Sequence, residues 1–238
     1  MATKPIVPLV IASAVSLLAL TACAPPSPTP TPSSSAITIE DPVTGDTVMT
    51  PIPLSGTANT FEGALTVDAL DADGNTMCIR NITATSGTGT RGTWQSVLAV
   101  APPETDAPIT LRAYELSAKD GSMINLVSRE VTLSATHPAI YILSPGCGAT
   151  ASPGSDFAVS GRAFVFEAQF ELELRDSSGT VALSTHVTAA SGTEESDWNA
   201  TLHLPAGLAH GDYDLVAFDN SAKDGSVENE FAIPIAVE

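Results

Sequence analysis

VSGRAFVFEAQFELELRDSSG (residues 159–179) repeats the earlier sequence LSGTANTFEGALTVDALDADG (54–74) at an offset of 105 residues. Both copies keep Ser-Gly, Phe-Glu and Asp-x-x-Gly in the same order. The hexapeptide SAKDGS also occurs twice, unchanged, at 117–122 and 221–226, an offset of 104. Solenoid repeats run about 20–50 residues, so repetition at about 100 residues indicates duplication of a whole domain.

Both copies alternate apolar and polar residues with a period of two, which predicts antiparallel strands with one buried face. The apolar members are Phe170, Leu172 and Leu174 in the second copy and Leu65, Val67 and Ala69 in the first. Gly- and Asp-containing turn signals separate these runs, and no segment shows a helical period. About seven short strands are expected per copy, with Trp94 and Trp198 as core residues on the fifth strand. The predicted fold class is all-β, with two tandem immunoglobulin-like β-sandwiches.

The motif order P-x-x-G…SG-x-A…FE…D-x-x-G…W…SAKDGS resembles the immunoglobulin-like domain of bacterial spore germination. The resemblance covers nearly all of residues 37–238, once in each copy. It implies a non-catalytic sandwich module of bacterial surface lipoproteins, with poorly defined ligands.

The N-terminal residues 1–22 have the pattern of a signal peptide, with one charge at Lys4 followed by an apolar run. The run ends at Leu20-Thr21-Ala22-Cys23, which resembles the lipobox of bacterial lipoproteins. That resemblance implies cleavage before Cys23 and lipidation of its thiol. The alternative is an ordinary secretory signal with an accidental cysteine. The expected location is extracytoplasmic, with a lipid anchor in the bacterial cell membrane.

Residues 23–36 follow as a linker rich in Pro, Thr and Ser, a composition that favours an extended, semi-rigid tether. The first immunoglobulin-like domain is expected at 37–135 and the second at 138–238. The joint between them, Thr136-His137-Pro138, is short, which predicts stiff coupling of the two domains.

The chain is strongly acidic, with nine Lys and Arg against 27 Asp and Glu and a net charge of −18. Nucleic acid is an implausible partner, because neutralising phosphates needs clustered cations. Direct adhesion to anionic lipid head groups is disfavoured for the same reason. The expected partners are the membrane, through the lipid anchor, and an unidentified envelope protein or cell-wall glycan.

Cys78 and Cys147 are the two remaining cysteines, one in each copy. In an extracytoplasmic protein they are candidates for a disulfide that clamps one domain to the other. The sequence leaves the pairing open, because disulfide geometry depends on the fold.

The SAKDGS segments are expected to form the hairpin between the last two strands of each domain, since Asp-Gly favours a tight turn. The loop that carries Phe-Glu is expected at the same end of the sandwich. Glu62 is therefore predicted to pair with Lys119, and Glu167 with Lys223, with the serines capping the turn. A ligand-binding loop is the alternative. The candidate residues are Phe61, Glu62, Ser117, Lys119, Asp120, Phe166, Glu167, Ser221, Lys223 and Asp224.

Asp71 and Asp73 precede Gly74 in a D-x-D-G pattern, which makes them weak candidates for calcium ligands. An Asp-Gly hairpin is the simpler explanation, and the second copy replaces the segment with RDSSG. No metal or other cofactor is expected, and no catalytic motif occurs, so the chain is predicted not to be an enzyme.

The sequence is compatible with three classes of function. The first is a binding module for an envelope protein or glycan, and the second is a passive spacer. The third is an accessory subunit of an envelope transporter or enzyme complex.

Overall fold

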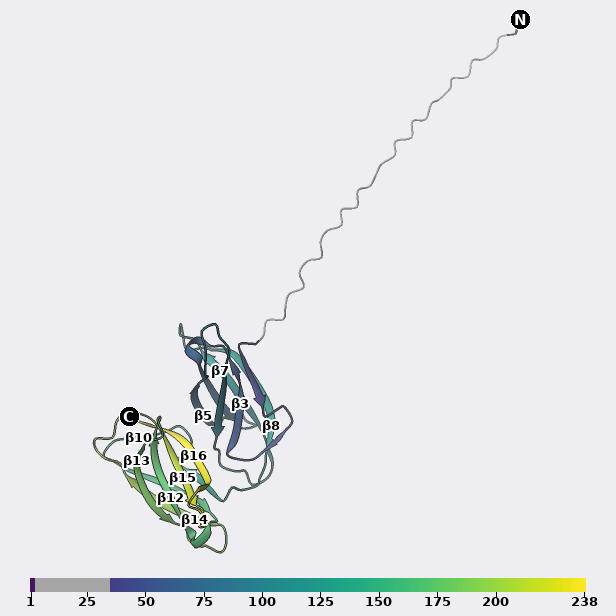
Figure 1. The fold of residues 1–238 in the computed structure, drawn as a ribbon. Helices are drawn as coiled ribbons and strands as arrows, with labels where there is room; N and C mark the ends of the chain where they lie inside the picture. The colour runs from purple at the N-terminus through teal and green to yellow at the C-terminus, as the bar shows by residue number, and fades with distance from the viewer. Residues whose placement is uncertain (3–34) are drawn as a thin grey trace. The chain divides into compact units, whose positions relative to one another are not determined.

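The structure is a computed structural model that describes residues 1–2 and 35–238. Most of the expected signal peptide, the lipidation site Cys23 and most of the linker therefore lie outside the described residues. Ser35–Glu238 forms one compact unit, which Figure 1 shows as two β-sandwiches. Nowhere in these described parts is there a helix with the length and hydrophobicity needed to span a bilayer. The predicted fold class is confirmed.

The first sandwich consists of a three-stranded and a five-stranded sheet, in the orders β1-β3-β6 and β2-β8-β7-β4-β5. A short 3₁₀ turn, Phe61–Gly63, connects β3 to β4. All strand pairs are antiparallel except β2 with β8. The strands are β1 (Ile37–Asp41), β2 (Thr47–Val48), β3 (Ile52–Ala58), β4 (Ala64–Leu70), β5 (Thr76–Thr83), β6 (Gly92–Leu98), β7 (Ala107–Leu116) and β8 (Met123–Leu133).

The second sandwich repeats this topology, with sheets in the orders β14-β11-β9 and β10-β16-β15-β12-β13. Its 3₁₀ turn is Phe166–Ala168. The strands are β9 (Ile140–Ser144), β10 (Ala149–Ala151), β11 (Asp156–Ala163), β12 (Gln169–Asp176), β13 (Val181–Thr188), β14 (Ser196–His203), β15 (Gly211–Asn220) and β16 (Val227–Val237).

Each copy thus has eight strands where the sequence predicts about seven, and each Trp lies on the sixth strand where the fifth is expected. The extra strands are β2 and β10, which have two and three residues and pair in parallel with the end of β8 and β16. A strand this short is below the length at which a period-two pattern can be recognised.

The core of each sandwich is built around its tryptophan, which packs over a glycine on the neighbouring strand. Gly161 lies opposite Trp198 in the β11–β14 pair, and Gly56 lies opposite Trp94 in the β3–β6 pair. A Cβ atom at Gly161 would lie 2.0 Å from the Tyr141 carbonyl oxygen and 2.7 Å from the Trp198 ring. Only a glycine therefore allows the indole to lie this close to the sheet.

The larger sheet of the first sandwich also buries a carboxylate on its outer face. Asp68 alternates with the core residues of β4, so the period-two pattern places it toward solvent. Its side chain is only 1% exposed, because Arg112 and Tyr114 cover it. Arg112 donates from Nε and Nη2 to the two Asp68 oxygens at 2.8 and 2.5 Å, and the Tyr114 hydroxyl lies 3.3 Å away. The buried charge is thus paired and hydrogen-bonded, as burial requires.

Substitution of Gly161 by alanine tests the packing of the tryptophan. We expect Gly161→Ala to lower the free energy of unfolding by about 3 kcal/mol, because the added methyl overlaps backbone and indole atoms. Gly207→Ala is the matched control, since a Cβ there has nothing within 4 Å. Chemical denaturation of both variants checks the prediction, and equal stabilities would contradict it.

Candidate functional site

The SAKDGS segments form the β7–β8 and β15–β16 hairpin turns. The Ser117 N–H donates to the Ser122 carbonyl at 2.9 Å, and Ser221 repeats this with Ser226 at 2.8 Å. Inside each turn an aspartate accepts from the serine two residues on, at 2.7 Å from the hydroxyl. These hydrogen bonds lower the pKa of Asp120 and of Asp224 from its usual value, and the bond from the serine hydroxyl has the largest effect.

The two ion pairs predicted from the sequence are wrong. Within the described residues, neither Lys119 nor Lys223 forms an ion pair with any carboxylate. Glu62 and Glu167 lie in the left-handed region, with φ of 55° and 57°, and they contribute to the loop through their backbone. The Glu62 N–H donates to the Thr88 hydroxyl at 2.9 Å.

A carboxylate that the sequence analysis missed, Glu115, connects the Phe-Glu loop to the hairpin. Its Oε1 accepts the Phe61 N–H and its Oε2 accepts the Asn125 side-chain amide, both at 2.9 Å. Asn125 has a positive φ of 56° where the β7–β8 register shifts. In the second copy the amide of Asn229 donates to Asp219 in the same way. The recurrence of Asn with an acid ten residues earlier, in both copies, was the available sequence signal.

Both loops present a phenylalanine to solvent. Phe61 is 60% exposed and Phe166 is 74% exposed. Phe61 also lines a surface hollow of about 390 Å³ with Leu116 and Ala118 of the hairpin. The predicted loop residues are thus brought to one end of each sandwich, as part of a hydrogen-bonded frame with an exposed aromatic ring.

Asp71 uses its carboxylate to close the β4–β5 turn. Its Oδ1 accepts the N–H groups of Asp73 and Asn75 at 2.9 and 2.8 Å, and its Oδ2 accepts the Asn75 amide at 2.9 Å. These hydrogen bonds lower the pKa of Asp71, and the bond from the Asn75 side chain has the largest effect. The described residues contain no group of three or more potential metal ligands.

Cys78 and Cys147 form a disulfide that joins the two sandwiches. The Cys147 side chain packs against the cores of both. Ala99, just after β6, also packs against the core of the second sandwich. The two cores thus lie side by side around a covalent link.

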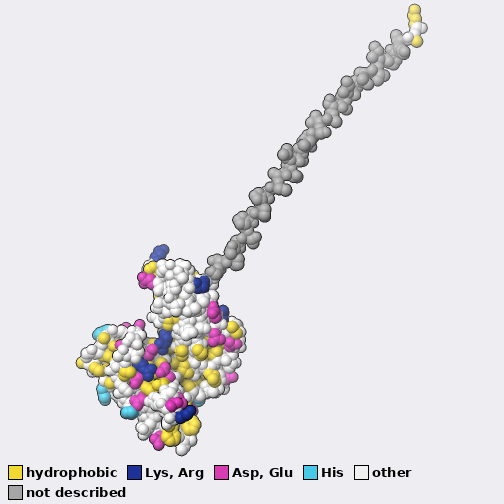
Figure 2. All heavy atoms as spheres, in the orientation of Figure 1, with side chains coloured by type: hydrophobic (Ala, Val, Ile, Leu, Met, Phe, Trp, Pro, Cys, Tyr) yellow, Lys and Arg dark blue, Asp and Glu magenta, His cyan; other side chains and the backbone are white. Residues whose placement is uncertain are grey.

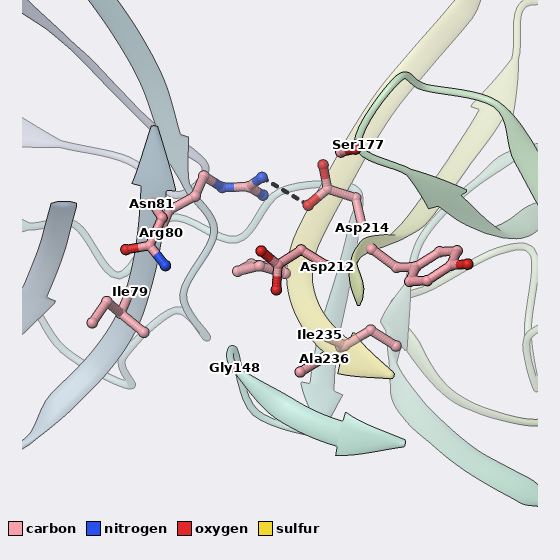
Figure 3. A pocket seen from close by; sticks show the side chains of 11 residues that line it. Ile79, Arg80, Asn81, Gly148, Ser177, Asp212, Asp214, Ile235 and Ala236 are labelled. Atoms are coloured by element: carbon pink, nitrogen blue, oxygen red, sulfur yellow. Dashed lines mark hydrogen bonds and ion pairs between the residues drawn. The ribbon is translucent and has the colours of Figure 1, made fainter. Parts of the chain in front are cut away.

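Next to this link is a recess of about 320 Å³ between the sandwiches, which we call the junction cleft (Figure 3). Arg80 of β5 and Asp214 of β15 point toward each other across it, with Nη1 and Oδ1 2.7 Å apart. The Arg80 Nε is buried without a hydrogen-bond partner among the described residues. The junction cleft is also lined by polar groups from Asn81, Ser177 and Asp212. No sequence pattern indicates this pair, because its members are 134 positions apart in different copies.

The joint between the domains is fixed to the second sandwich by polar contacts. His137 Nδ1 lies 2.9 Å from Glu195, and Arg162 donates to the same carboxylate at 3.0 Å. Burial raises the pKa of Tyr141 to about 12, and contact with Glu195 adds a smaller effect in the same direction. Burial opposes ionisation of Glu195, but hydrogen bonds from Tyr141 and His137 and the Arg162 charge outweigh it and lower the Glu195 pKa.

A family model for the immunoglobulin-like domain of bacterial spore germination matches the chain twice, at residues 36–122 and 139–226. The chain belongs to this family. The two matches correspond to the two sandwiches, so the tandem arrangement is confirmed. Families of immunoglobulin-like domains such as this one are generally non-catalytic. No curated protein matches the chain.

Several solved structures align with most of this chain at low sequence identity. The fibronectin(III)-like modules of Clostridium thermocellum CbhA match with 14% identity and a TM-score of 0.28, covering 85% of this chain and 94% of that one. The ICAM-5 D1–D4 fragment matches with 17% identity and a TM-score of 0.31, covering 85% and 53%. Rst D1–D2 matches with 12% identity and a TM-score of 0.27, covering 85% and 100%. Similarity at this level says nothing about ligands.

Removal of the disulfide tests how strongly the sandwiches depend on their link. The bridge closes a loop with a sequence separation of 69, for which chain entropy predicts a stabilisation of about 4 kcal/mol. We expect Cys78→Ala/Cys147→Ala to lose most of this and to unfold at a lower temperature, as measured by calorimetry. Reductant should lower the melting temperature of the parent chain and leave the double variant unchanged. A parent chain indifferent to reductant would contradict the prediction.

Proposed function

We propose that the chain is a non-catalytic, lipid-anchored surface protein whose two sandwiches form one stiff arm that binds a component of the cell envelope. The observation that carries this proposal is the pairing of two family domains through a covalent link. Independent binding modules on a flexible linker need no such link. A fixed pair keeps a surface made by both domains in one geometry, which reduces the entropy lost on binding.

The junction cleft is the surface we assign to binding. It combines apolar walls from Ile79 and Ile235 with charged and amide groups from both sandwiches. Ligand sites favour recesses at domain interfaces with a few convergent polar groups. Asp212 presents a carboxylate to this cleft in addition to the Arg80–Asp214 pair (Figure 3). This lining fits hydroxyl and amide groups, which both glycans and peptides carry.

The acidity of the chain restricts the partner. Acidic side chains are spread over the face in Figure 2, with few Lys and Arg among them. Such a surface repels other acidic polymers and raises the association rate of neutral or basic ones. The proposed partner is therefore a neutral or basic envelope protein or cell-wall glycan.

The lipid anchor is tested directly on Cys23. We expect the full chain, expressed in a bacterium, to incorporate a labelled fatty acid and to sediment with membranes. Cys23→Ser should lose the label and be released, because only an acylated chain partitions stably into lipid. Labelling that is equal in the parent and in Cys23→Ser would contradict the anchor.

Binding is tested with the Ser35–Glu238 unit immobilised and exposed to envelope extract and to purified cell-wall fragments. We expect recovery of a defined partner or glycan, and loss of it with Asp212→Ala, which leaves the Arg80–Asp214 pair intact. Glu228→Ala is the control, because Glu228 lies near the hairpin end of β16, away from the cleft residues Ile235 and Ala236. Recovery of nothing would overturn the binding role and leave spacing as the function.

A further inference from the structure

One end of the first sandwich exposes a group of large apolar side chains, which we call the apolar tip. Its members come from the Phe-Glu loop and the β7–β8 hairpin, and each has 40–60% of its surface exposed. They are Phe61 at 60%, Leu116 at 53%, Leu126 at 48%, Met123 at 46% and Ile124 at 40%. Leu116 lies opposite Met123 in the hairpin, and Phe61 lines a surface hollow with Leu116. Exposed apolar groups gathered at one end of a domain mark surfaces that contact a protein or a membrane.

The apolar tip lies at the end where the described chain begins. The Ala36 carbonyl accepts a hydrogen bond at 2.8 Å from the N–H of Asn59, and Asn59 is two residues before Phe61. Arg91 donates to the Ser35 carbonyl beside it. Phe61 is in turn held by Glu115, next to Leu116 at the end of β7. Ser35 and the apolar tip therefore share one end of the sandwich (Figure 1).

The second copy has the same hairpin with fewer apolar residues around it, although its Phe-Glu loop exposes Phe164 and Phe166. Both hairpins contain SAKDGS, and both have a positive-φ asparagine at the bulge. At the flanking positions the apolar residues of the first copy are replaced by polar or smaller ones. Leu116, Met123, Ile124 and Leu126 correspond to Asn220, Val227, Glu228 and Glu230. The fold therefore does not require apolar residues at these positions, and something specific to the first sandwich accounts for them.

We infer that the apolar tip rests on the surface of the lipid bilayer. The inference depends on the lipid anchor at Cys23 that is part of the proposed function. Eleven residues, 24–34, separate Cys23 from Ser35, so the tether spans at most about 40 Å even when fully extended. The tip is at the end of the first sandwich where this tether attaches, whereas the second sandwich follows the opposite end of β8, at Leu133.

Charge favours lipid over a second copy of the chain as the occupant. Two copies, each with a net charge of −18, repel one another. At the tip itself the cations Arg91 and Lys119 accompany the acids Glu62, Glu115 and Asp120, so the local excess of negative charge is far smaller than that of the whole chain. The Lys119 ammonium has no ion-pair partner within the described residues and is free to reach lipid phosphates. At the end of the second sandwich, Glu228 adds a charge that opposes such contact, whereas Glu230 is paired with Arg175.

The test uses a tryptophan placed at the tip. The chain from residue 24 carries a hexahistidine tag in place of Cys23 and is attached to phosphatidylcholine vesicles containing a nickel-chelating lipid. We expect the added fluorescence of Phe61→Trp to shift to the blue and to be quenched by doxyl-labelled phosphatidylcholine. Phe166→Trp, the same position in the second copy, is the matched control and should show neither effect. Quenching that is no greater for Phe61→Trp than for Phe166→Trp would overturn the inference.

Two further changes distinguish the effect of the tip's side chains from the effect of the position at which the chain is attached. Replacing Leu116, Met123, Ile124 and Leu126 by their second-copy counterparts should abolish the quenching of Phe61→Trp while the fold is retained, as checked by circular dichroism. Moving the tag to the C-terminus should also abolish it. Sedimentation that shows a dimer of the Phe61→Trp variant, with the introduced indole shielded in the absence of lipid, would overturn the inference in favour of self-association. Because the tag replaces the acyl group, failure here is distinguishable from failure of Cys23 lipidation.

Discussion

The close packing of a tryptophan against a glycine organises each sandwich. Trp198 extends across the sheet at Gly161, and Phe170 of the opposite sheet meets its ring edge-on at 5.1 Å. The indole thereby spans the space between the two layers, and the aliphatic residues of both sheets pack around it. A side chain at the glycine would displace the indole and separate the layers. The first sandwich uses Gly56 and Trp94 for the same purpose.

With this frame constant, the two copies have diverged on their outer faces. In the first, Asp68 is covered by Arg112 from the neighbouring strand. In the second, the acid at that place is Glu173, and its partner is Arg175, two residues along the same strand. Arg175 also lies over the ring of Phe218, the counterpart of Tyr114, at 4.9 Å. The acid and the aromatic ring keep their positions, while the guanidinium comes from a different strand.

The fold was predictable from the sequence because duplication doubles every signal. Alternation, turn residues and SAKDGS all recur, and each copy supports the interpretation of the other. The contacts that set the candidate sites were not predictable in the same way. Glu62 has the charge to pair with Lys119, but its left-handed backbone turns the loop so that Glu115 holds it. Arg80 meets Asp214 only because the two copies pack together, and a pattern within one copy carries no information on that packing.

The disulfide also determines how the described chain carries mechanical tension. When the N-terminal end is pulled and the second sandwich is held, the covalent path runs through β1 to β5, reaches Cys78 and crosses directly to Cys147. The strands β6, β7, β8 and β9 lie in the bypassed segment and bear no covalent load. Unfolding under force can therefore lengthen only the segments outside the bridge. A pair of domains built in this way lengthens less under tension than an unbridged pair would, and the β7–β8 hairpin remains within a closed loop even if the strands around it separate.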